Sequence, residues 1–296
     1  MSNSSALHSE PARRRLTPAQ YYHKPARLTR LLMRTGLLER DQMFWWWPDQ
    51  KINFGDWVGP LIYEWRTGRR PLYCNSAGSA RGQYYLTAGS ILSFNHQPDR
   101  AVVWGSGVIS DQVPISRPKQ IHAVRGPMTR QRYLDEGFDC PDVYGDPGIL
   151  VPHVLELDGI SPNFRLGIIP HFSEAHMVPE LVRANPDIKI IDVLSDVETV
   201  SRQIADCAHI CSSSLHGLII THALNRPAAW IRFSEGTHID GWKFQDYYRS
   251  GRIEDLSGPS WINAEVTPDD LIDLARRAPR PDTERLMNPL LQACPF

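Results

Sequence analysis

Strand-like and helix-like segments alternate along most of the chain, and this alternation constrains the fold more than any other feature. In the second half, residues 164–169, 209–211 and 228–233 have the apolar content of short buried strands. Helix-like segments over 197–207 and 215–224 separate them. Strands that alternate with helices and end in turns are typical of a parallel sheet covered by helices.

The first half shows the same alternation. Pro127 is well placed as the first residue of a helix that runs to Glu136. We expect strands over 71–74, 91–94, 101–104, 120–124 and 142–144. Two such series in tandem predict an α/β chain with two Rossmann-like domains that face a cleft.

The predicted domain boundaries follow from turn-rich stretches. Residues 156–163 contain Gly, Ser, Pro and Asn and indicate a linker. We therefore place an N-terminal domain over 49–158 and a C-terminal domain, ending in a helix, over 163–296. A chain of 296 residues, 42% of them hydrophobic, is long enough for both.

Charge is unevenly distributed along the chain. Residues 1–40 carry eight Lys and Arg and two Glu, a net charge of +6, whereas the whole chain has −1. We expect residues 1–48 to form a basic, partly disordered arm. A solvated tail and a contact with an anionic membrane surface remain alternatives for it. The net charge of −1 for the whole chain does not indicate nucleic acid as a partner.

Features that the sequence lacks bear on the location of the protein and on the oxidation state of its cysteines. No run approaches about 18 apolar residues, so we expect no transmembrane helix. The N-terminus lacks the apolar core of a signal peptide. Five cysteines without a CxxC pattern indicate reduced thiols and no zinc site. These features predict a cytoplasmic protein, with the arm as a possible contact to the inner face of the membrane.

The stretch 209–220 combines a predicted strand, a tight turn and the start of a predicted helix. Ser213 and Ser214 are good N-cap residues, and Gly217 allows a close approach of backbone or ligand. A helix N-terminus attracts anions, and His216 at its mouth titrates near neutral pH. A capped helix with a packed histidine is the alternative.

Ligands of parallel sheets bind beyond the carboxyl ends of the strands. The cleft is therefore expected to collect Asn53, Gly55, Asp56, Gly105, Ser106, Gly107, Arg125, Gly126, Asp146, His171 and residues 212–217. The Arg125 guanidinium could donate two hydrogen bonds to one carboxylate or phosphate. The alternative is a structural role, in which it caps a neighbouring helix. Asp146 before Pro147 also fits an Asx turn, and Asp56 fits a helix cap.

Several catalytic signatures are missing from the sequence. It contains no Gly-x-Gly-x-x-Gly, no P-loop and no HExxH motif. It also lacks an Asp-x-Asp pair, which disfavours a glycosyltransferase that holds its nucleotide through a metal ion. Helix N-termini, one arginine and two histidines suit a small anion with several charges.

The chain resembles the polysaccharide pyruvyl transferase family over about residues 50–250. The resemblance rests on Asn53-Phe54-Gly55-Asp56, Trp104-Gly105-Ser106-Gly107, Val124-Arg125-Gly126-Pro127, Gly145-Asp146-Pro147 and Ser212-Ser213-Ser214-Leu215-His216-Gly217. Lys243-Phe244-x-Asp246-Tyr247-Tyr248 is similar to the bacterial exopolysaccharide ketal pyruvyltransferase branch. The resemblance implies a glycosyltransferase type B-like fold, phosphoenolpyruvate as the donor substrate, no cofactor, and a glycan or lipid-linked oligosaccharide as acceptor.

The resemblance also implies roles for individual residues. His216 would protonate the donor or bind its phosphate, Arg125 would hold the donor, and Asp56 or Asp146 would accept a proton from a sugar hydroxyl. Ser214 stands where some members have a basic residue.

Lys243 or His171 is therefore expected to help hold the donor. Two alternatives remain open for the function: a nucleotide-sugar glycosyltransferase of the same fold, and a non-catalytic carbohydrate-binding relative.

Overall fold

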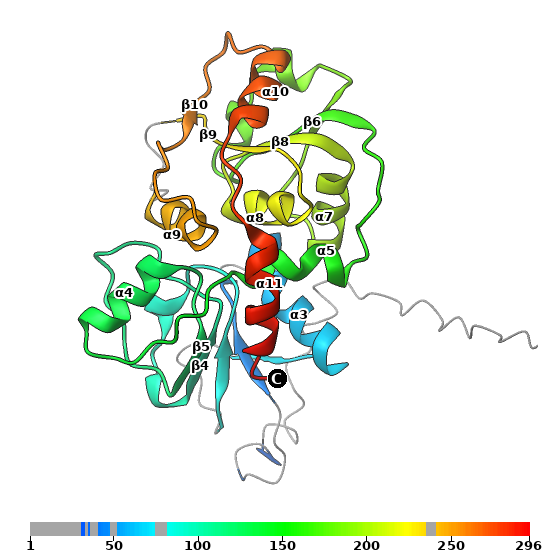
Figure 1. Cartoon of the computed structure of the whole chain (residues 1–296). Helices are drawn as coiled ribbons and strands as arrows, with labels where there is room; N and C mark the ends of the chain where they lie inside the picture. The colour runs from blue at the N-terminus through cyan, green and yellow to red at the C-terminus, as the bar shows by residue number, and fades with distance from the viewer. Residues whose placement is uncertain (1–30, 33–34, 36–40, 48–51, 75–81, 235–240) are drawn as a thin grey trace, which may run out of the picture.

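The computed structural model describes residues 31–32, 35, 41–47, 52–74, 82–234 and 241–296. Two five-stranded sheets lie one above the other in Figure 1, and helices pack around both. Every strand pairing within the sheets is parallel. The predicted α/β class is confirmed, and the two parallel sheets are consistent with the two Rossmann-like domains expected. Most of the arm predicted over 1–48 lies outside the described residues.

The two sheets share one strand order. The first, in spatial order, contains β2 (Leu72–Tyr73), β1 (Gln42–Phe44), β3 (Tyr84–Leu86), β4 (Ala101–Trp104) and β5 (Gln120–Ala123). The second contains β10 (Ser260–Trp261), β9 (Ala228–Arg232), β8 (Cys207–Ser212), β6 (Phe164–Ile169) and β7 (Ile188–Ile190). Numbered from its own first strand, each sheet has the order 2-1-3-4-5, so the strand order reverses between β1 and β3 and between β6 and β8.

Helices connect the strands and cover the sheets. Those of the first domain are η2 (Phe54–Trp57), α3 (Val58–Thr67), η3 (Leu92–Phe94), η4 (Pro98–Arg100), α4 (Pro127–Asp135), η5 (Pro147–Leu150) and α5 (Val151–Val154), where η marks a 3₁₀ helix. The second domain contains η6 (Ala175–Met177), α6 (Glu180–Arg183), α7 (Val197–Ala205), α8 (Leu215–Ala223), α9 (Trp242–Ser250) and α10 (Pro268–Arg277). The last helix is α11 (Thr283–Gln292).

Strand β1 lies inside the range that the sequence assigns to the basic arm. It pairs with β2 on one side and with β3 on the other, so the first sheet begins before the expected domain start at residue 49. The aromatic run that follows explains the difference. Trp45 is buried and packs edge-on against Trp57, with ring centroids 5.3 Å apart, whereas Trp46 is 41% exposed. The adjacent tryptophans therefore do not all enter one core.

The predicted strand over 91–94 is wrong. Residues Leu92–Phe94 form the 3₁₀ helix η3. The third strand of this sheet lies earlier, at β3, and Gly89 then turns the chain with a φ of 94°. Residues 142–144 also form no full strand, because the pairing is a single bridge between Val124 and Tyr144.

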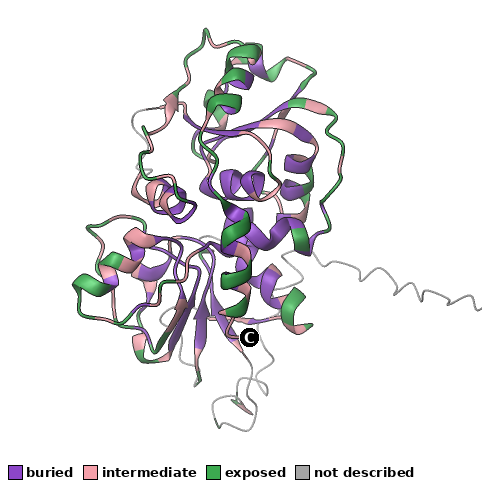
Figure 2. Cartoon of the chain, in the orientation of Figure 1, coloured by how far each residue is buried: buried purple, intermediate pink, exposed green. Residues whose placement is uncertain are grey.

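The last helix links the two domains. Figure 1 shows α11 running from the second domain along the first. The Trp104 indole donates to the Leu290 carbonyl at 2.8 Å, and the Phe296 ring contacts Trp104 and Tyr85. One hydrophobic cluster contains Met43 of the first domain together with Ile219 of the second. Figure 2 shows this buried zone at the junction. A continuous apolar interface holds two domains in a fixed relation.

Candidate active site

His216 and Asp146 meet where the two domains pack together. His216 lies in the first turn of α8, and Asp146 precedes η5. The Nε2 atom of His216 is 3.5 Å from Asp146 Oδ2, with Asp146 fully buried and His216 9% exposed. The predicted site residues from the two domains are thus brought together by α8 and η5.

Gly55 leaves the space that the His216 ring occupies. A Cβ atom at Gly55 would lie 2.1 Å from His216 Nδ1, so any side chain there would displace the imidazole. The Phe54 ring packs edge-on to the imidazole at 6.3 Å. Phe54 also donates its backbone N–H to the Val193 carbonyl at 2.9 Å, which ties η2 to the second domain. These contacts fix the position of His216.

Asp146 is held as a carboxylate. Its Oδ1 accepts from the Gly148 N–H at 2.8 Å, and its Oδ2 accepts from the Gly89 N–H at 3.4 Å. Burial alone would raise its pKa, but His216, the Gly148 N–H and Arg125 together lower that pKa below its ordinary value. The Asx turn weighed from the sequence therefore exists, and the same side chain also faces His216.

Asp56 differs from Asp146 in its protonation. Burial raises the pKa of Asp56 to about 7, against the lowering effects of His216 and Lys243, and Asp146 adds to the rise. A carboxyl group with such a pKa exchanges a proton near neutral pH. The sequence suggested Asp56 as the cap of the next helix, but the N-cap of α3 is Trp57, and Asp56 lies inside η2. Asn53 caps η2, because its Oδ1 accepts from the Gly55 N–H at 3.2 Å.

Two serine side chains, those of Ser212 and Ser213, accept hydrogen bonds that hold the turn before α8. Ser212 Oγ accepts from the Ser214 N–H at 3.0 Å, and Ser213 Oγ accepts from the His171 N–H at 2.7 Å. Ser214 occupies the N-cap position, but its side chain makes no cap hydrogen bond within the described part of the chain, contrary to expectation. The N-terminus of α8 therefore keeps its attraction for anions.

Two predicted positions hold this turn by packing. A Cβ atom at Gly217 would lie 2.5 Å from Ser212 Oγ, so only glycine fits beside the serine. Leu215 is 6% exposed and joins the shared hydrophobic cluster. Both residues therefore shape the site without offering a polar side chain to a ligand.

Lys243 supplies positive charge to this site, whereas His171 does not. Burial and the charge of Lys243 lower the pKa of His171 to about 4, although Glu174 opposes the shift. His171 is therefore neutral at pH 7, and its Nδ1 lies 2.8 Å from Ser173 Oγ. Of the two expected cations, Lys243 remains as the charged one. Its charge acts on both Asp56 and His171.

Arg125 has an enclosed environment that differs from the open donor-binding position expected for it. The side chain is fully buried, and it donates to Asp246 Oδ2 at 3.0 Å, Ser90 Oγ at 2.6 Å and the Val108 carbonyl at 2.6 Å. A Cβ atom at Gly107 would lie 2.4 Å from the guanidinium carbon. These contacts make Arg125 part of a buried network in the structure.

Asp246 of α9 completes this network from the second domain. Its Oδ1 accepts from the Thr129 N–H at 3.0 Å, and its Oδ2 accepts from Thr129 Oγ1 at 2.7 Å. Gly126 at the N-cap of α4 has no side chain to cap the helix, and a Cβ atom there would lie 2.0 Å from the Asp246 carbonyl oxygen. Asp246 therefore caps α4 from the other domain. We call Arg125, Thr129 and Asp246 the interdomain clamp.

Gly105 and Ser106 support the turn after β4. Gly105 has a φ of 84°, and a Cβ atom there would lie 2.4 Å from Pro147 Cδ. Ser106 Oγ donates to the Gly89 carbonyl at 2.9 Å, and the Ser106 carbonyl accepts from the Arg125 N–H at 3.0 Å. The two residues thus join the turns that carry Asp146 and Arg125.

Sequence reasoning missed Gly89, Ser90 and Thr129. Gly89 donates to Asp146, Ser90 accepts from Arg125, and Thr129 donates to Asp246. The small-residue stretch 87–90 directly after the apolar run Tyr84–Leu86 was the available signal for the first two. Thr129 gave no signal, because it sits inside the helix α4.

The described ranges give no indication of a metal centre or a membrane span. Within them, no group of three His, Cys, Asp or Glu side chains is arranged to hold a metal ion. The same ranges contain no helix that is both long enough and apolar enough to cross a bilayer.

Comparison with known proteins identifies the family. The sequence model for "Polysaccharide pyruvyl transferase" matches residues 100–235. The chain is also 26% identical over 211 residues to the succinoglycan biosynthesis protein ExoV of Rhizobium meliloti, a match that covers 69% of the chain and 63% of that protein. The chain belongs to the polysaccharide pyruvyl transferase family.

Two further proteins are similar to this family member. An uncharacterised protein of Acanthamoeba polyphaga mimivirus is 33% identical over 210 residues, which cover 69% of the chain and 72% of that protein. A functionally uncharacterised protein of Klebsiella pneumoniae has a crystal structure with a TM-score of 0.45 and 11% identity, covering 79% of this chain and 96% of that one.

The family match spans parts of both domains. It includes Arg125, Asp146 and His216 but ends before Lys243 and begins after Asp56. The His216–Asp146 pair thus comes from the matched segment, whereas the titrating Asp56 and the cation of α9 are added by flanking segments. The candidate site of this pyruvyl transferase family member consequently includes residues outside the segment that the family model covers.

Proposed function

We propose that this protein transfers pyruvate from phosphoenolpyruvate to a sugar of an exopolysaccharide or other cell-surface glycan, forming a cyclic ketal. The observation that carries the proposal is the His216–Asp146 pair beside Asp56, whose pKa is about 7, at the N-terminus of α8. Membership of the family and similarity to a succinoglycan biosynthesis protein support polysaccharide biosynthesis as its setting.

The α8 N-terminus and Lys243 suit the anionic donor. Phosphoenolpyruvate carries a carboxylate and a phosphate, and the partial positive charge of a helix N-terminus attracts such groups. The Lys243 ammonium adds a full positive charge, which acts on Asp56 and His171. In this scheme Arg125 acts through the clamp that holds α9.

His216 is the proposed general acid. It donates a proton to the methylene carbon of phosphoenolpyruvate, and the neighbouring carbon becomes cationic. The Asp146 carboxylate, 3.5 Å away, stabilises the imidazolium before transfer and orients the ring. One sugar hydroxyl then attacks the cationic carbon, and its proton goes to a base.

Asp56 is the proposed base. A carboxyl group with a pKa of about 7 is partly ionised at neutral pH and can accept the hydroxyl proton. The second hydroxyl attacks the same carbon, the carbon–oxygen bond to phosphate breaks, and inorganic phosphate leaves with the remaining proton. The product carries two new carbon–oxygen bonds and a carboxylate.

The setting of the reaction is also part of the proposal. We propose a glycosyltransferase type B-like arrangement, a cytoplasmic location and an acceptor repeat unit carried on a membrane lipid. The net charge of +6 over residues 1–40 would favour contact with the anionic inner leaflet. Binding of the whole chain to anionic vesicles, compared with a chain that starts at Asp41, tests this part.

Donor binding separates the proposed function from its alternatives. The purified protein is heated with phosphoenolpyruvate, with UDP-sugars or alone. A ligand at 100 times its dissociation constant stabilises the folded state by about 2.7 kcal/mol. We expect phosphoenolpyruvate to raise the melting temperature and, with acceptor glycan, to release inorganic phosphate. Stabilisation by UDP-sugars alone would favour a glycosyltransferase, and stabilisation by glycan alone a non-catalytic binding protein.

A further inference from the structure

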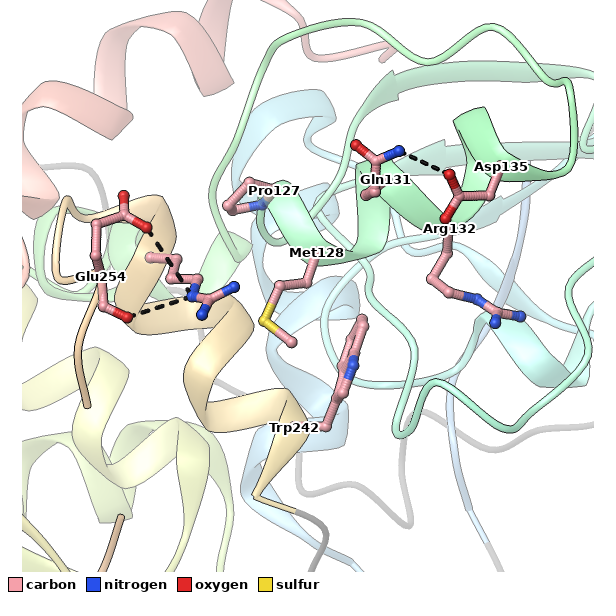
Figure 3. A pocket seen from close by; sticks show the side chains of 8 residues that line it. Pro127, Met128, Gln131, Arg132, Asp135, Trp242 and Glu254 are labelled. Atoms are coloured by element: carbon pink, nitrogen blue, oxygen red, sulfur yellow. Dashed lines mark hydrogen bonds and ion pairs between the residues drawn. The ribbon is translucent and has the colours of Figure 1, made fainter. Parts of the chain in front are cut away.

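A pocket of about 420 Å³ lies between α4 of the first domain and α9 of the second. Its volume is within the range of sites for small ligands. Figure 3 shows the Met128 thioether directed toward the Trp242 indole, which together form an apolar surface. The polar members of the lining are Gln131, Arg132, Asp135, Arg249 and Glu254.

The interdomain clamp holds the two walls of this pocket together. Asp246 of α9 accepts three hydrogen bonds, two from Thr129 of α4 and one from Arg125, and both charged side chains are fully buried. Trp242 also packs against the hydrophobic cluster of the first domain. The pocket is therefore preformed, because a rigid contact between its two helices fixes its width.

The charges that line the pocket are balanced. The lining holds two arginines and two carboxylates, and the Arg132 guanidinium donates to the backbone carbonyls of Asp111 and Val113. Arg249 Nε lies 4.0 Å from Glu254 Oε2. This arrangement gives little net attraction for an anion such as the donor.

The apolar and polar groups of the pocket lining suit an uncharged sugar ring. An indole and a thioether offer a flat apolar surface to the C–H face of a sugar. The Gln131 amide, which bonds to the exposed Asp135 at 2.7 Å, and the carboxylate of Glu254 offer donors and acceptors at the edge, where hydroxyl groups would lie.

The pocket adjoins the proposed active site through α9. Trp242 and Lys243 are consecutive residues of this helix, so their side chains leave it about 100° apart; Trp242 lines the pocket, and the charge of Lys243 acts on Asp56 and His171. We propose that the pocket binds one neutral sugar residue of the acceptor glycan, next to the sugar that receives pyruvate. This inference rests on the proposed function for the role of the occupant.

The test compares Trp242→Ala with a matched control. Binding of methyl glycosides of glucose, galactose and mannose is measured by saturation-transfer NMR and titration, with glucuronate as a charged comparison. We expect at least one neutral glycoside to bind the parent, glucuronate to bind no better, and Trp242→Ala to weaken binding about tenfold. Trp261→Ala, which removes a 51% exposed indole from β10, should leave binding unchanged.

A second variant, Gln131→Ala, keeps the test decisive if Trp242→Ala does not fold. Gln131 is exposed and bonds to Asp135, so Gln131→Ala should melt like the parent and still weaken glycoside binding. The pocket inference would be overturned if no neutral glycoside bound the parent, or if the folded Trp242→Ala and Gln131→Ala proteins bound it unchanged. A failure of the proposed function is detected by a different measurement, because phosphoenolpyruvate would then not raise the melting temperature.

Discussion

Arg125 and Asp246, which are 121 positions apart in the sequence, form a fully buried ion pair with 3.0 Å between Nε and Oδ2. The same carboxylate caps α4 through Thr129, so one side chain of the second domain completes a helix of the first. The clamp fixes α9, and α9 carries Lys243 into the proposed active site and Trp242 into the pocket.

Asp246→Asn should destabilise the protein strongly. Asparagine keeps the size of the side chain but turns an N–H donor or a neutral oxygen toward the buried guanidinium. Removing one partner of a buried pair typically costs about 3–5 kcal/mol, because the other charge is left uncompensated. Urea denaturation at pH 7 measures the free energy of unfolding.

Asp269→Asn is the matched control for Asp246→Asn. Asp269 pairs with Arg165 at 2.7 Å, but the two side chains are 79% and 57% exposed. Exposed pairs contribute about 0–1 kcal/mol, so the control should unfold near the parent. Equal stability of Asp246→Asn and Asp269→Asn would contradict the structural role of the clamp.

Arg125→Lys should also destabilise. A lysine ammonium keeps the charge but cannot reach Asp246, Ser90 and Val108 in the fixed planar arrangement of a guanidinium. A buried carbonyl left without its donor costs about 1–3 kcal/mol. Thermal melting and the Michaelis constant for phosphoenolpyruvate are measured together. An unchanged melting temperature with a raised Michaelis constant would instead favour direct donor binding.

Local sequence patterns predicted the elements of the second domain better than those of the first. Phe164–Ile169 is a strand as expected, because a continuous apolar run at the centre of a parallel sheet leaves a clear signal. β1 had no such signal, since its three residues precede an aromatic run that also suits an arm. The run at 91–94 is apolar but follows a glycine turn, so it became η3.

The sequence indicated which residues gather at the candidate site, but not their contacts or their protonation states. His216, Asp146 and Asp56 lie together as predicted from the carboxyl ends of two sheets. The enclosure of Arg125 could not be predicted, because its partner belongs to a helix of the other domain. The different protonation of Asp56 and Asp146 likewise depends on burial and on N–H donors that tertiary packing supplies.

Asp56→Asn should be more stable than the parent at pH 8. The pKa of Asp56 in the folded state, about 7, exceeds the unfolded value near 3.8. The folded state therefore binds more protons, and the parent loses stability as pH rises from about 4 to about 7. The loss is at most about 4 kcal/mol and stays constant above that range. Asparagine, which does not ionise, avoids it.

Urea denaturation of both proteins between pH 4 and pH 8 measures the Asp56 effect. The stability difference between Asp56→Asn and the parent should be small near pH 4 and largest at pH 8. Asp99→Asn, at η4 and remote from the site residues in the sequence, serves as the control. A difference that did not grow with pH would show that Asp56 is an ordinary carboxylate.

His216→Gln tests the centre of the proposed mechanism. Glutamine keeps a donor group and similar bulk beside Gly55, so the melting temperature should stay near that of the parent. Loss of a general acid typically lowers turnover by about 10²–10⁴-fold, and we expect a loss in this range. Phosphate release from phosphoenolpyruvate in the presence of acceptor glycan gives both turnover and the donor Michaelis constant.

Two other outcomes for His216→Gln have distinct meanings. If His216 binds phosphate and transfers no proton, the donor Michaelis constant should rise while turnover is spared. If the histidine only packs against Phe54 and Asp146, the variant should melt lower and keep its activity per folded molecule. His176→Gln, at an exposed position in η6, should change none of the three quantities. A destabilised but fully active His216→Gln protein would therefore remove His216 from the reaction.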